Sequence, residues 1–423
     1  MKSMKFIVIA SHFFACGETG NIGIGATKKY QPKLRYDSQP SAQPASMNSP
    51  PPSADVTMST HSTPHSTISS QTLIREDKEI SELFENPLHN FGYDTPVPDN
   101  MSDTEHLLIC CACGTQFDAD DRSILTRCRI CDDPRQFVPP TGQSFTTLAA
   151  LKACGKFKNR WKPFENDDRF WSIWTEPKFS IGQRAVLITT PHGNILWDCI
   201  TYIDDDTVDW IHGLGGLAAI VISHPHYYTT HLEWAETFDC PVYLSWEDKG
   251  WLNRLDRLGK ARTFIEGTEE ELEIRGEKIG VKALKLGGHF PGSLVCLAYG
   301  RLLIADTLVT TPAGMGDWSK GPGGGEQARP DGMNSFSFMW SIPNMIPLSA
   351  DEVVGMWEVL KRHEFTSTHG AFVGQELVDG GNGSKKGVKQ RVLESMQIQV
   401  RRMGWKDHVF LKEKCNEPEE EIL

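Results

Sequence analysis

The chain has 423 residues, of which 39% are hydrophobic, and a formal net charge of −12. This length allows two or three folded units, and an acidic chain without a Lys/Arg-rich segment is a poor ligand for a nucleic-acid backbone. No apolar run approaches the roughly 18 residues that a transmembrane helix needs. We therefore expect no nucleic-acid partner and no membrane span.

The first hundred residues are poor in core-forming side chains. Residues 38–71 are rich in Ser, Pro, Thr and Gln, and such a composition cannot bury enough apolar surface to offset the entropy of ordering. We predict a disordered extension over residues 1–100. Its opening, MKSMKFIVIASHFFACG, is similar to a secretory signal, but the 11 cysteines of the chain would tend to pair in an oxidising compartment. We favour an intracellular location, cytoplasmic or nuclear, with secretion as the alternative.

Four cysteines within residues 101–140 have the spacing of a zinc ribbon, Cys110-x2-Cys113 followed by Cys128-x2-Cys131. Two paired thiolates can hold one tetrahedral ion, which stabilises a unit too small for a large core. Iron fits the same spacing, and buried free thiols are the remaining alternative. Because four thiolates leave no open coordination position, we expect a structural role.

Residues 141–178 contain no Ser/Pro linker and several aromatic side chains. We expect this segment to connect the ribbon to the next domain while packing on that domain. The ribbon itself should therefore dock there.

Short apolar runs bounded by Gly, Pro and Asp follow within residues 179–412 and indicate strands. They are RAVLITT, NILWDCI, AAIVIS, PVYLS, KIGVKALKL, SLVCLAY and RLLIAD. Helices are indicated at HLEWAETF, at ADEVVGMWEVLKRH after the capping-box pair Ser349 and Glu352, and over residues 386–405. The pattern predicts an α/β domain of two packed halves, followed by an acidic tail over residues 413–423.

Histidines and one aspartate stand near the ends of these strands: His224 and His226 in SHPHYYTTH, His289 in GGHFPGS, Asp306 in IADTL and His369 in STHGAF. A metal site on a large fold collects its ligands from several strand ends. Each histidine alone fits a hydrogen-bonded core position equally well. The joint pattern predicts a metal site, next to a long Gly/Pro-rich segment, residues 307–340, of the kind that often forms a lid.

In this order the motifs resemble those of the metallo-β-lactamase superfamily over roughly residues 179–374. With the ribbon, the chain is similar to a form seen in uncharacterised fungal and bacterial members. The resemblance implies a four-layer αββα sandwich with a small N-terminal zinc ribbon.

The resemblance also implies the roles of individual residues. His224, His226 and His289 correspond to the ligands of the first metal. Asp306 corresponds to the carboxylate beside or between the metals, and His369 to a ligand of the second metal.

The second metal site departs from the family pattern, because its Asp and His fall on Tyr228 and Thr229, which are poor ligands for a hard divalent ion. We therefore expect a mononuclear site, with His231, Tyr228 and His369 facing the substrate or supporting the ligands. A two-residue insertion in the loop would instead put His231 in the place of the missing histidine.

Zinc held by three imidazoles lowers the pKa of a bound water to about 7 and makes hydroxide available to attack a carbonyl. We expect a zinc-dependent hydrolase of a small ester, thioester, lactone or lactam. Asp306 would accept the proton of the water, and Tyr228 or His231 would stabilise the oxyanion or protonate the leaving group. The alternatives are a mononuclear iron dioxygenase of the same superfamily and a non-catalytic interaction protein stabilised by its metals.

Overall fold

The computed structural model describes residues 104–321 and 327–415, all within the unit Asp94–Leu423. The predicted disordered extension, its signal-like opening and most of the acidic tail lie outside the described residues. No helix in the described part of the chain is long and apolar enough to cross a membrane.

Residues 104–146, here called the four-cysteine unit, fold around the four spaced cysteines. After the short helix η2 (Thr104–His106), strand β1 (Ile109–Cys110) pairs antiparallel with β2 (Phe145–Thr146). A small core surrounds the thiols, formed by Leu108, Phe117, Leu125 and Ile130. Helix α2 (Leu148–Ala153) follows directly.

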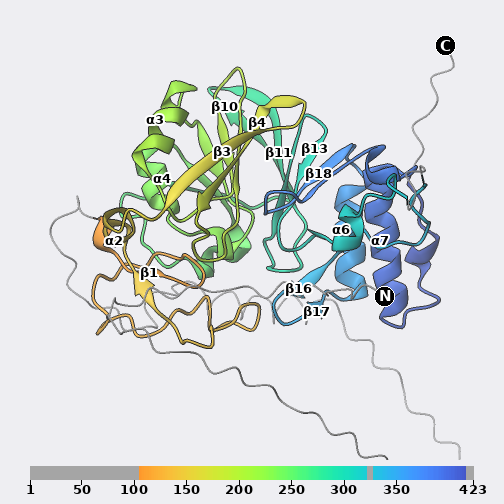
Figure 1. Ribbon diagram of the computed structural model, residues 1–423, viewed down its shortest axis with the longest axis horizontal. Coiled ribbons are helices and arrows are strands. Elements are labelled where there is room, and N and C mark those ends of the chain that lie inside the picture. Colours follow the sequence, from red (N-terminus) through yellow and green to blue (C-terminus); the bar gives the residue numbers. More distant parts are fainter. Residues whose placement is uncertain (1–103, 322–326, 416–423) are drawn as a thin grey trace, which may run out of the picture. The chain divides into compact units, whose positions relative to one another are not determined.

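A seven-stranded sheet with the order β3-β4-β5-β6-β7-β8-β9 forms one half of the sandwich. Its strands are β3 (Lys158–Phe164), β4 (Asp167–Glu176), β5 (Ala185–Ile188), β6 (Ile195–Trp197), β7 (Ala219–Val221), β8 (Val242–Ser245) and β9 (Arg262–Ile265). Strands β6 to β9 run parallel. Helices α3 (Asp205–Gly213) and α4 (His231–Phe238) cover its outer face (Figure 1).

The sheet takes β3 and β4 from residues 158–176, a segment for which the sequence indicated only a connection. In β3, charged and exposed residues alternate with covered ones, as at Asn159, Trp161 and Phe164. An edge strand that faces solvent on one side carries no continuous apolar run. The apolar-run criterion therefore missed it.

A six-stranded sheet with the order β10-β11-β12-β13-β18-β19 forms the second half. Its strands are β10 (Glu269–Ile274), β11 (Glu277–Lys285), β12 (Leu294–Ala298), β13 (Arg301–Leu303), β18 (Ser367–His369) and β19 (Glu376–Val378). Helices α6 (Ala350–Leu360) and α7 (Val388–Arg402) lie beside this sheet (Figure 1). The predicted capping box of Ser349 and Glu352 begins α6.

Between β13 and α6, the Gly/Pro-rich segment forms small elements of its own. They are β14 (Val309–Thr310), α5 (Pro312–Met315), β15 (Phe336–Ser337), β16 (Met339–Ser341) and β17 (Ile346–Pro347). Strand β14 pairs with β15, and β16 pairs with β17. The second pair is called the β16–β17 hairpin below.

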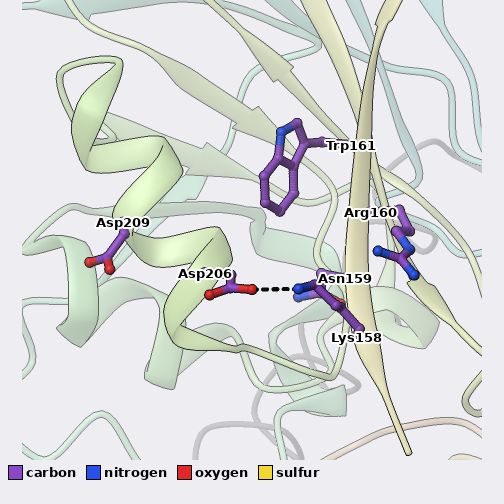
Figure 2. A pocket seen from close by; sticks show the side chains of 6 residues that line it. All are labelled: Lys158, Asn159, Arg160, Trp161, Asp206 and Asp209. Atoms are coloured by element: carbon purple, nitrogen blue, oxygen red, sulfur yellow. Dashed lines mark ion pairs between the residues drawn. The ribbon is translucent and has the colours of Figure 1, made fainter.

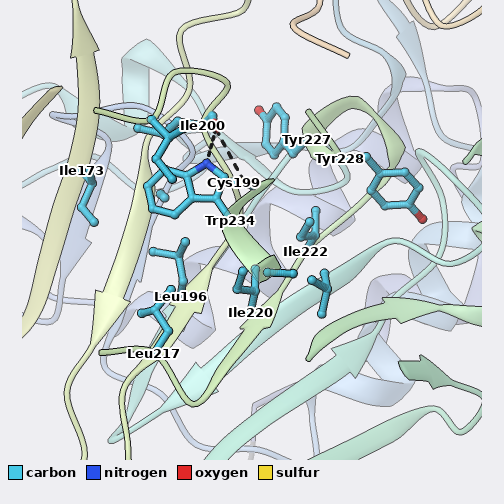
Figure 3. Packing of buried hydrophobic residues seen from close by; sticks show 14 of the residues in the cluster. Ile173, Leu196, Cys199, Ile200, Leu217, Ile220, Ile222, Tyr227, Tyr228 and Trp234 are labelled. Atoms are coloured by element: carbon cyan, nitrogen blue, oxygen red, sulfur yellow. Dashed lines mark hydrogen bonds between the residues drawn. The ribbon is translucent and has the colours of Figure 1, made fainter. Parts of the chain in front are cut away.

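The side chains of the central strands alternate between two buried cores, because successive residues of a strand point to opposite faces. On β6, Leu196 joins the core beneath α3 and α4 (Figure 3), whereas Ile195 joins the core between the two sheets. On β12, Val295 packs under α6 and α7, and Cys296 packs between the sheets. Three cores thus separate four layers, and the predicted αββα sandwich of metallo-β-lactamase type is confirmed.

Candidate metal centre

Three imidazoles and one carboxylate meet where loops leave both sheets. His224 follows β7 closely, and His226 lies in the short helix η3 (Pro225–Tyr227). His289 lies in the turn between β11 and β12, and Asp306 follows β13. All four side chains are buried, and one ligand atom of each lies within 4.8 Å of the others. The group can hold a metal ion.

The distances within this group fit one shared ion. His289 Nε2 lies 3.1 Å from His226 Nδ1. Asp306 Oδ2 lies 3.4 Å from His224 Nε2, 3.9 Å from His226 Nδ1 and 3.8 Å from His289 Nε2. Ligand atoms about 2.0–2.1 Å from a tetrahedral zinc ion would be about 3.4 Å apart. The donor set of three nitrogens and one oxygen therefore suits a divalent transition metal.

Hydrogen bonds behind the ligands fix their orientation. The Nδ1 atom of His289 is 2.7 Å from the backbone oxygen of Trp340, so it carries the proton and leaves Nε2 as a lone pair. His224 Nδ1 lies 2.8 Å from Ser223 Oγ. The hydroxyl of Tyr227 donates to Asp306 Oδ1 at 2.8 Å. His224 Nε2 is buried without a hydrogen-bond partner among the described residues, which is the state expected of a metal ligand.

Electrostatics keep the group in the protonation state that binds metal. Burial lowers the pKa of His226 to about 4. Burial, together with the neighbouring His226 and His224, lowers the pKa of His289 well below its usual value. Burial opposes ionisation of Asp306, but the neighbouring His224 and His226 hold its pKa well below the ordinary range. At neutral pH His226 and His289 are thus neutral imidazoles and Asp306 is a carboxylate, the forms that bind a cation.

The GGHFPGS turn is built to present His289. Gly287 and Gly288 have φ values of +67° and +84°, a region that side-chain-bearing residues rarely adopt. A Cβ atom on Gly288 would come within 2.6 Å of Leu348 and 2.7 Å of Thr307. The hydroxyl of Thr307 donates to the oxygen of Gly287 at 2.6 Å and accepts from the nitrogen of His289 at 3.3 Å. The two motifs GGHFPGS and ADTL thus hold each other.

His369, expected as a ligand of a second metal, lies elsewhere. It is the last residue of β18 and pairs in parallel with Leu303, whose side chain faces the core between the sheets. Its ring stacks on Phe164 with centroids 4.3 Å apart, and its Nε2 lies 3.1 Å from Ser367 Oγ and 3.3 Å from an Arg301 nitrogen. The strand register directs this imidazole to the inter-sheet core, so it does not join the four-residue group.

His231, which an insertion would have made a ligand, is also occupied. Its Nδ1 donates to the backbone oxygen of Tyr228 at 2.7 Å, and its Nε2 accepts from Arg262 Nε at 2.9 Å. Burial and Arg262 keep its pKa well below the usual value. The Tyr228 hydroxyl is buried and has no hydrogen-bond partner among the described residues. Neither residue belongs to the four-residue group.

The thiols of Cys110, Cys113, Cys128 and Cys131 form the second group that can hold a metal, here called the thiolate site. Cys110 and Cys131 sulfurs are 3.6 Å apart, and Cys113 and Cys128 sulfurs are 3.5 Å apart, close to the roughly 3.8 Å between ligands of a tetrahedral zinc–thiolate site. Hydrogen bonds from the other thiols lower the pKa of Cys110, whereas burial raises that of Cys113. Several thiolates can coexist in this buried space only with a cation between them.

The four-cysteine unit docks on the sandwich, as expected. The nitrogen of Gln116 donates to the oxygen of Thr229 at 3.2 Å, and Arg254 pairs with Asp118 at 3.3 Å. Gly114 has a φ of +81°, and a Cβ atom there would lie 2.1 Å from Thr201 Oγ1. At Gly114, the backbone of the four-cysteine unit therefore lies directly against the sandwich.

In the described part of the chain, hollows are found away from the metal centre. A groove of about 540 Å³ between β3 and α3 is lined by Asn159, Trp161 and ion-paired Lys158 and Asp206 (Figure 2). None of the four metal-centre residues lines it. A second hollow, of about 450 Å³, lies between residues 131–138 of the four-cysteine unit and the β16–β17 hairpin.

Sequence reasoning missed several groups that shape the centre. Tyr227 stood inside the quoted His-x-His loop, yet nothing in the sequence distinguished it from Tyr228. Trp340 acts through its backbone oxygen, which carries no sequence signal. Asp248 accepts from the nitrogen of Gly292 at 3.0 Å, and burial raises its pKa to about 6. It anchors the GGHFPGS turn from a distant helix, η4 (Trp246–Trp251).

Among curated proteins, the chain is 37% identical over 270 residues to the uncharacterized protein YmaE of Bacillus subtilis strain 168, a match that covers 62% of this chain and 88% of YmaE. No family model matches the chain.

Among solved structures, a B3 metallo-β-lactamase with an active-site glutamic acid shares 12% identity, with 61% of this chain and 96% of that chain covered and a TM-score of 0.36. The DIM-1 metallo-β-lactamase shares 10% identity, with coverages of 58% and 98% and a TM-score of 0.38. A flavo di-iron protein from Thermotoga maritima shares 14% identity, with coverages of 57% and 62% and a TM-score of 0.34. The αββα layers of the two sheets and their helices make the fold metallo-β-lactamase-like. By its identity to a relative of which it covers 88%, the chain belongs to the same family as YmaE of Bacillus subtilis.

Proposed function

We propose that this protein is a metal-dependent hydrolase with one zinc ion in its catalytic site, acting on the carbonyl of a small ester, thioester, lactone or lactam. The observation that carries the proposal is the convergence of three imidazoles and one carboxylate, whose ligand atoms lie within 4.8 Å of one another. Four closely spaced ligand atoms of this kind are the donor set of a mononuclear site, with room for a water or substrate in an expanded coordination sphere.

His224, His226, His289 and Asp306 would hold the ion. A bound zinc ion supplies a nucleophile near neutral pH and polarises a carbonyl. The Tyr227 hydroxyl fixes Asp306 through Oδ1 and leaves Oδ2 toward the imidazoles. Because the pKa of Asp306 is held low, we assign it to binding the ion rather than to accepting a proton.

Tyr228 is the candidate donor to the developing oxyanion. It occupies the position at which the superfamily places a carboxylate, and its hydroxyl has no hydrogen-bond partner among the described residues. Burial raises its pKa well above the ordinary value, so the hydroxyl stays protonated and can donate. His231 holds the backbone of Tyr228 and Arg262 holds His231, which makes His231 a positioning residue.

The test begins with metal content. Protein purified without added metal is analysed by mass spectrometry, and the same sample is assayed against representative esters, thioesters, lactones and lactams before and after chelation. The proposal predicts one zinc equivalent in addition to that of the four-cysteine unit, and hydrolysis that a chelator abolishes and zinc restores.

Iron in the catalytic site, with oxygen uptake in place of hydrolysis, would contradict the proposal and favour the dioxygenase alternative. Two stable metal equivalents without turnover of any of these substrate classes would favour the interaction protein instead.

A further inference from the structure

We propose that the four-cysteine unit supports the catalytic metal centre. Arg135, which belongs to that unit, positions His289 and Phe290. The state of the thiolate site would therefore affect the affinity of the imidazole site for its ion. This inference rests on the proposed presence of a metal among the imidazoles. It assigns Arg135 as a positioning residue.

Arg135 reaches from the four-cysteine unit to the turn that carries His289. Its Nη1 donates to the backbone oxygen of His289 at 3.3 Å. Its guanidinium carbon lies 3.8 Å from the centre of the Phe290 ring and 4.8 Å from that of Trp251. The side chain is 10% exposed. A guanidinium stacked on an aromatic ring and hydrogen-bonded at its edge fixes the position of that ring.

The ring of Phe290 packs against the three imidazole ligands. Its ring meets those of His226 and His289 edge to face, with centroids 4.9 Å and 5.1 Å apart. It also lies 5.9 Å from the ring of His224. One aromatic ring thus touches all three imidazoles on one side, and the four-cysteine unit holds that ring from the other.

Asp133, which lies in the same segment, neutralises the charge of Arg135. Asp133 accepts from Arg135 Nε at 2.7 Å and from Nη2 at 2.9 Å in a two-point contact. An unpaired cation beside the imidazoles would repel a divalent ion, whereas a neutral pair positions them without that cost. Asp133 stands two residues after Cys131, so a metal held by the thiolates fixes the start of this segment.

The β16–β17 hairpin locks the same segment from the opposite side. Asn344 Nδ2 donates to the oxygens of Pro134 at 2.8 Å and Gln136 at 3.0 Å, and Ser341 Oγ donates to the oxygen of Pro134 at 3.0 Å. The neighbouring Trp340 offers its backbone oxygen to His289 Nδ1. His289 is therefore held by the four-cysteine unit through Arg135 and by the hairpin, and these two supports hold each other.

Cadmium-113 distinguishes the two sites, because four-thiolate and nitrogen/oxygen ligand sets give well-separated NMR resonances. Full-length metal-free protein is titrated with cadmium, and a competing chelator gives the affinity of each site. We expect Arg135→Met to shift the nitrogen/oxygen resonance and to weaken that site about 10- to 100-fold, with the thiolate resonance unchanged. Arg135→Lys, which keeps the charge and a donor, should restore part of the affinity.

Arg122→Met is the matched control. Arg122 also belongs to the four-cysteine unit, but its guanidinium carbon lies 4.0 Å from the centre of the Phe145 ring and it donates to the oxygen of Thr126 at 3.2 Å, both within that unit. It should leave the nitrogen/oxygen site unchanged. Asn344→Ala, a surface change that loosens the segment around Pro134, should weaken that site by a smaller factor and serves where Arg135→Met fails to fold.

Three outcomes overturn the inference. Equal cadmium affinities and equal nitrogen/oxygen resonances in wild type and Arg135→Met would show that Arg135 does not position the ligands. Equal losses in Arg122→Met and Arg135→Met would show a general effect of loosening the unit. A wild-type protein that gives only the thiolate resonance would refute the proposed function itself, and the inference would fall with it.

Discussion

The two groups of this chain that can hold a metal draw their ligands from the sequence in different ways. The thiolate site draws all its ligands from residues 110–131 and is surrounded by a core of a few side chains. The imidazole site draws its ligands from residues 224–306, on loops of two sheets whose cores are complete without any ion. We therefore expect the first site to need a metal in order to fold, whereas the fold itself brings the ligands of the second site together.

Ligand chemistry follows the same division. Four thiolates saturate a tetrahedral ion and leave no place for substrate, which suits a structural site. Three imidazoles and a carboxylate bind more weakly and can admit a further ligand, which suits catalysis. The proposed link through Arg135 couples the affinities of the two sites reciprocally. Because four thiolates bind far more tightly, we expect damage to the imidazole site to leave the thiolate site occupied, whereas damage to the thiolate site should measurably weaken the imidazole site.

The largest effect should come from replacing Cys113 and Cys128 together by serine. The change removes two buried thiolates and with them a metal-binding free energy on the order of 10 kcal/mol. We expect the loss of one metal equivalent, rapid proteolysis within residues 104–146 and weakened cadmium binding at the imidazole site, measured by mass spectrometry, limited proteolysis and NMR. Unchanged metal content would mean that these cysteines are buried free thiols.

Replacing His226 by alanine should have the opposite pattern. The imidazole site loses one of its three nitrogen ligands, so its metal and all hydrolytic turnover should be lost. The thiolate site should keep its ion, and residues 104–146 should stay resistant to protease. A variant that retains two metal equivalents would show that His226 is not a ligand.

The contrast between the sites also explains what the sequence could predict. Cysteine spacing is local, so the thiolate group could be identified without knowledge of the fold. His289 and Asp306 lie in short turns whose glycine and threonine residues are hydrogen-bonded to each other. Such turns can be recognised from their sequence alone, whatever the pairing of the strands around them. His369 could not be placed in this way, because the pairing of β18 with β13 decides which face its side chain takes.

The same reasoning applies to the fold. The central strands were predictable because both faces are buried and their sequences are continuously apolar. Strands β3 and β4 were missed because one face is exposed and carries charges such as Lys158 and Arg160. The backbone oxygen of Trp340 and the reach of Arg135 depend on tertiary packing alone, and no sequence pattern records them.

Tyr228→Phe separates binding from catalysis within the imidazole site. Loss of the proposed oxyanion donor should lower turnover about 100-fold while both metal equivalents are kept. Because the hydroxyl is buried without a hydrogen-bond partner among the described residues, its removal should leave the free energy of unfolding unchanged or raise it slightly. Full turnover in this variant would remove Tyr228 from the mechanism.

His231→Ala should have a smaller effect on turnover, about 10-fold, because His231 acts through the backbone of Tyr228. Metal stoichiometry should stay the same. Two catalytic-domain equivalents in the wild type, one of them lost in this variant, would instead show that His231 is a ligand of a second metal.

The smallest effect concerns a bridge between the two sheets whose loops carry the ligands of the imidazole site. Asp167 of β4 accepts from Arg301 of β13 at 2.8 Å and from Arg169 at 2.9 Å. Hydrogen bonds from Arg169 and Arg301 lower its pKa to about 2 from an ordinary value of 3.8. Because the folded state stabilises the ionised form of Asp167, this carboxylate adds its full contribution to the free energy of unfolding above about pH 4. The contribution is lost as the pH falls through about 2.

We therefore expect Asp167→Asn to lower the free energy of unfolding by about 1 kcal/mol at pH 7, a value discounted for the solvent exposure of Arg169. Urea unfolding of metal-free wild type and variant should show this difference shrinking below about pH 4. The imidazole site should lose a little cadmium affinity and the thiolate site none, because only the first takes its ligands from both sheets. A difference in unfolding free energy that persists unchanged at about pH 2 would mean that Asp167 stabilises the fold by packing and not by charge.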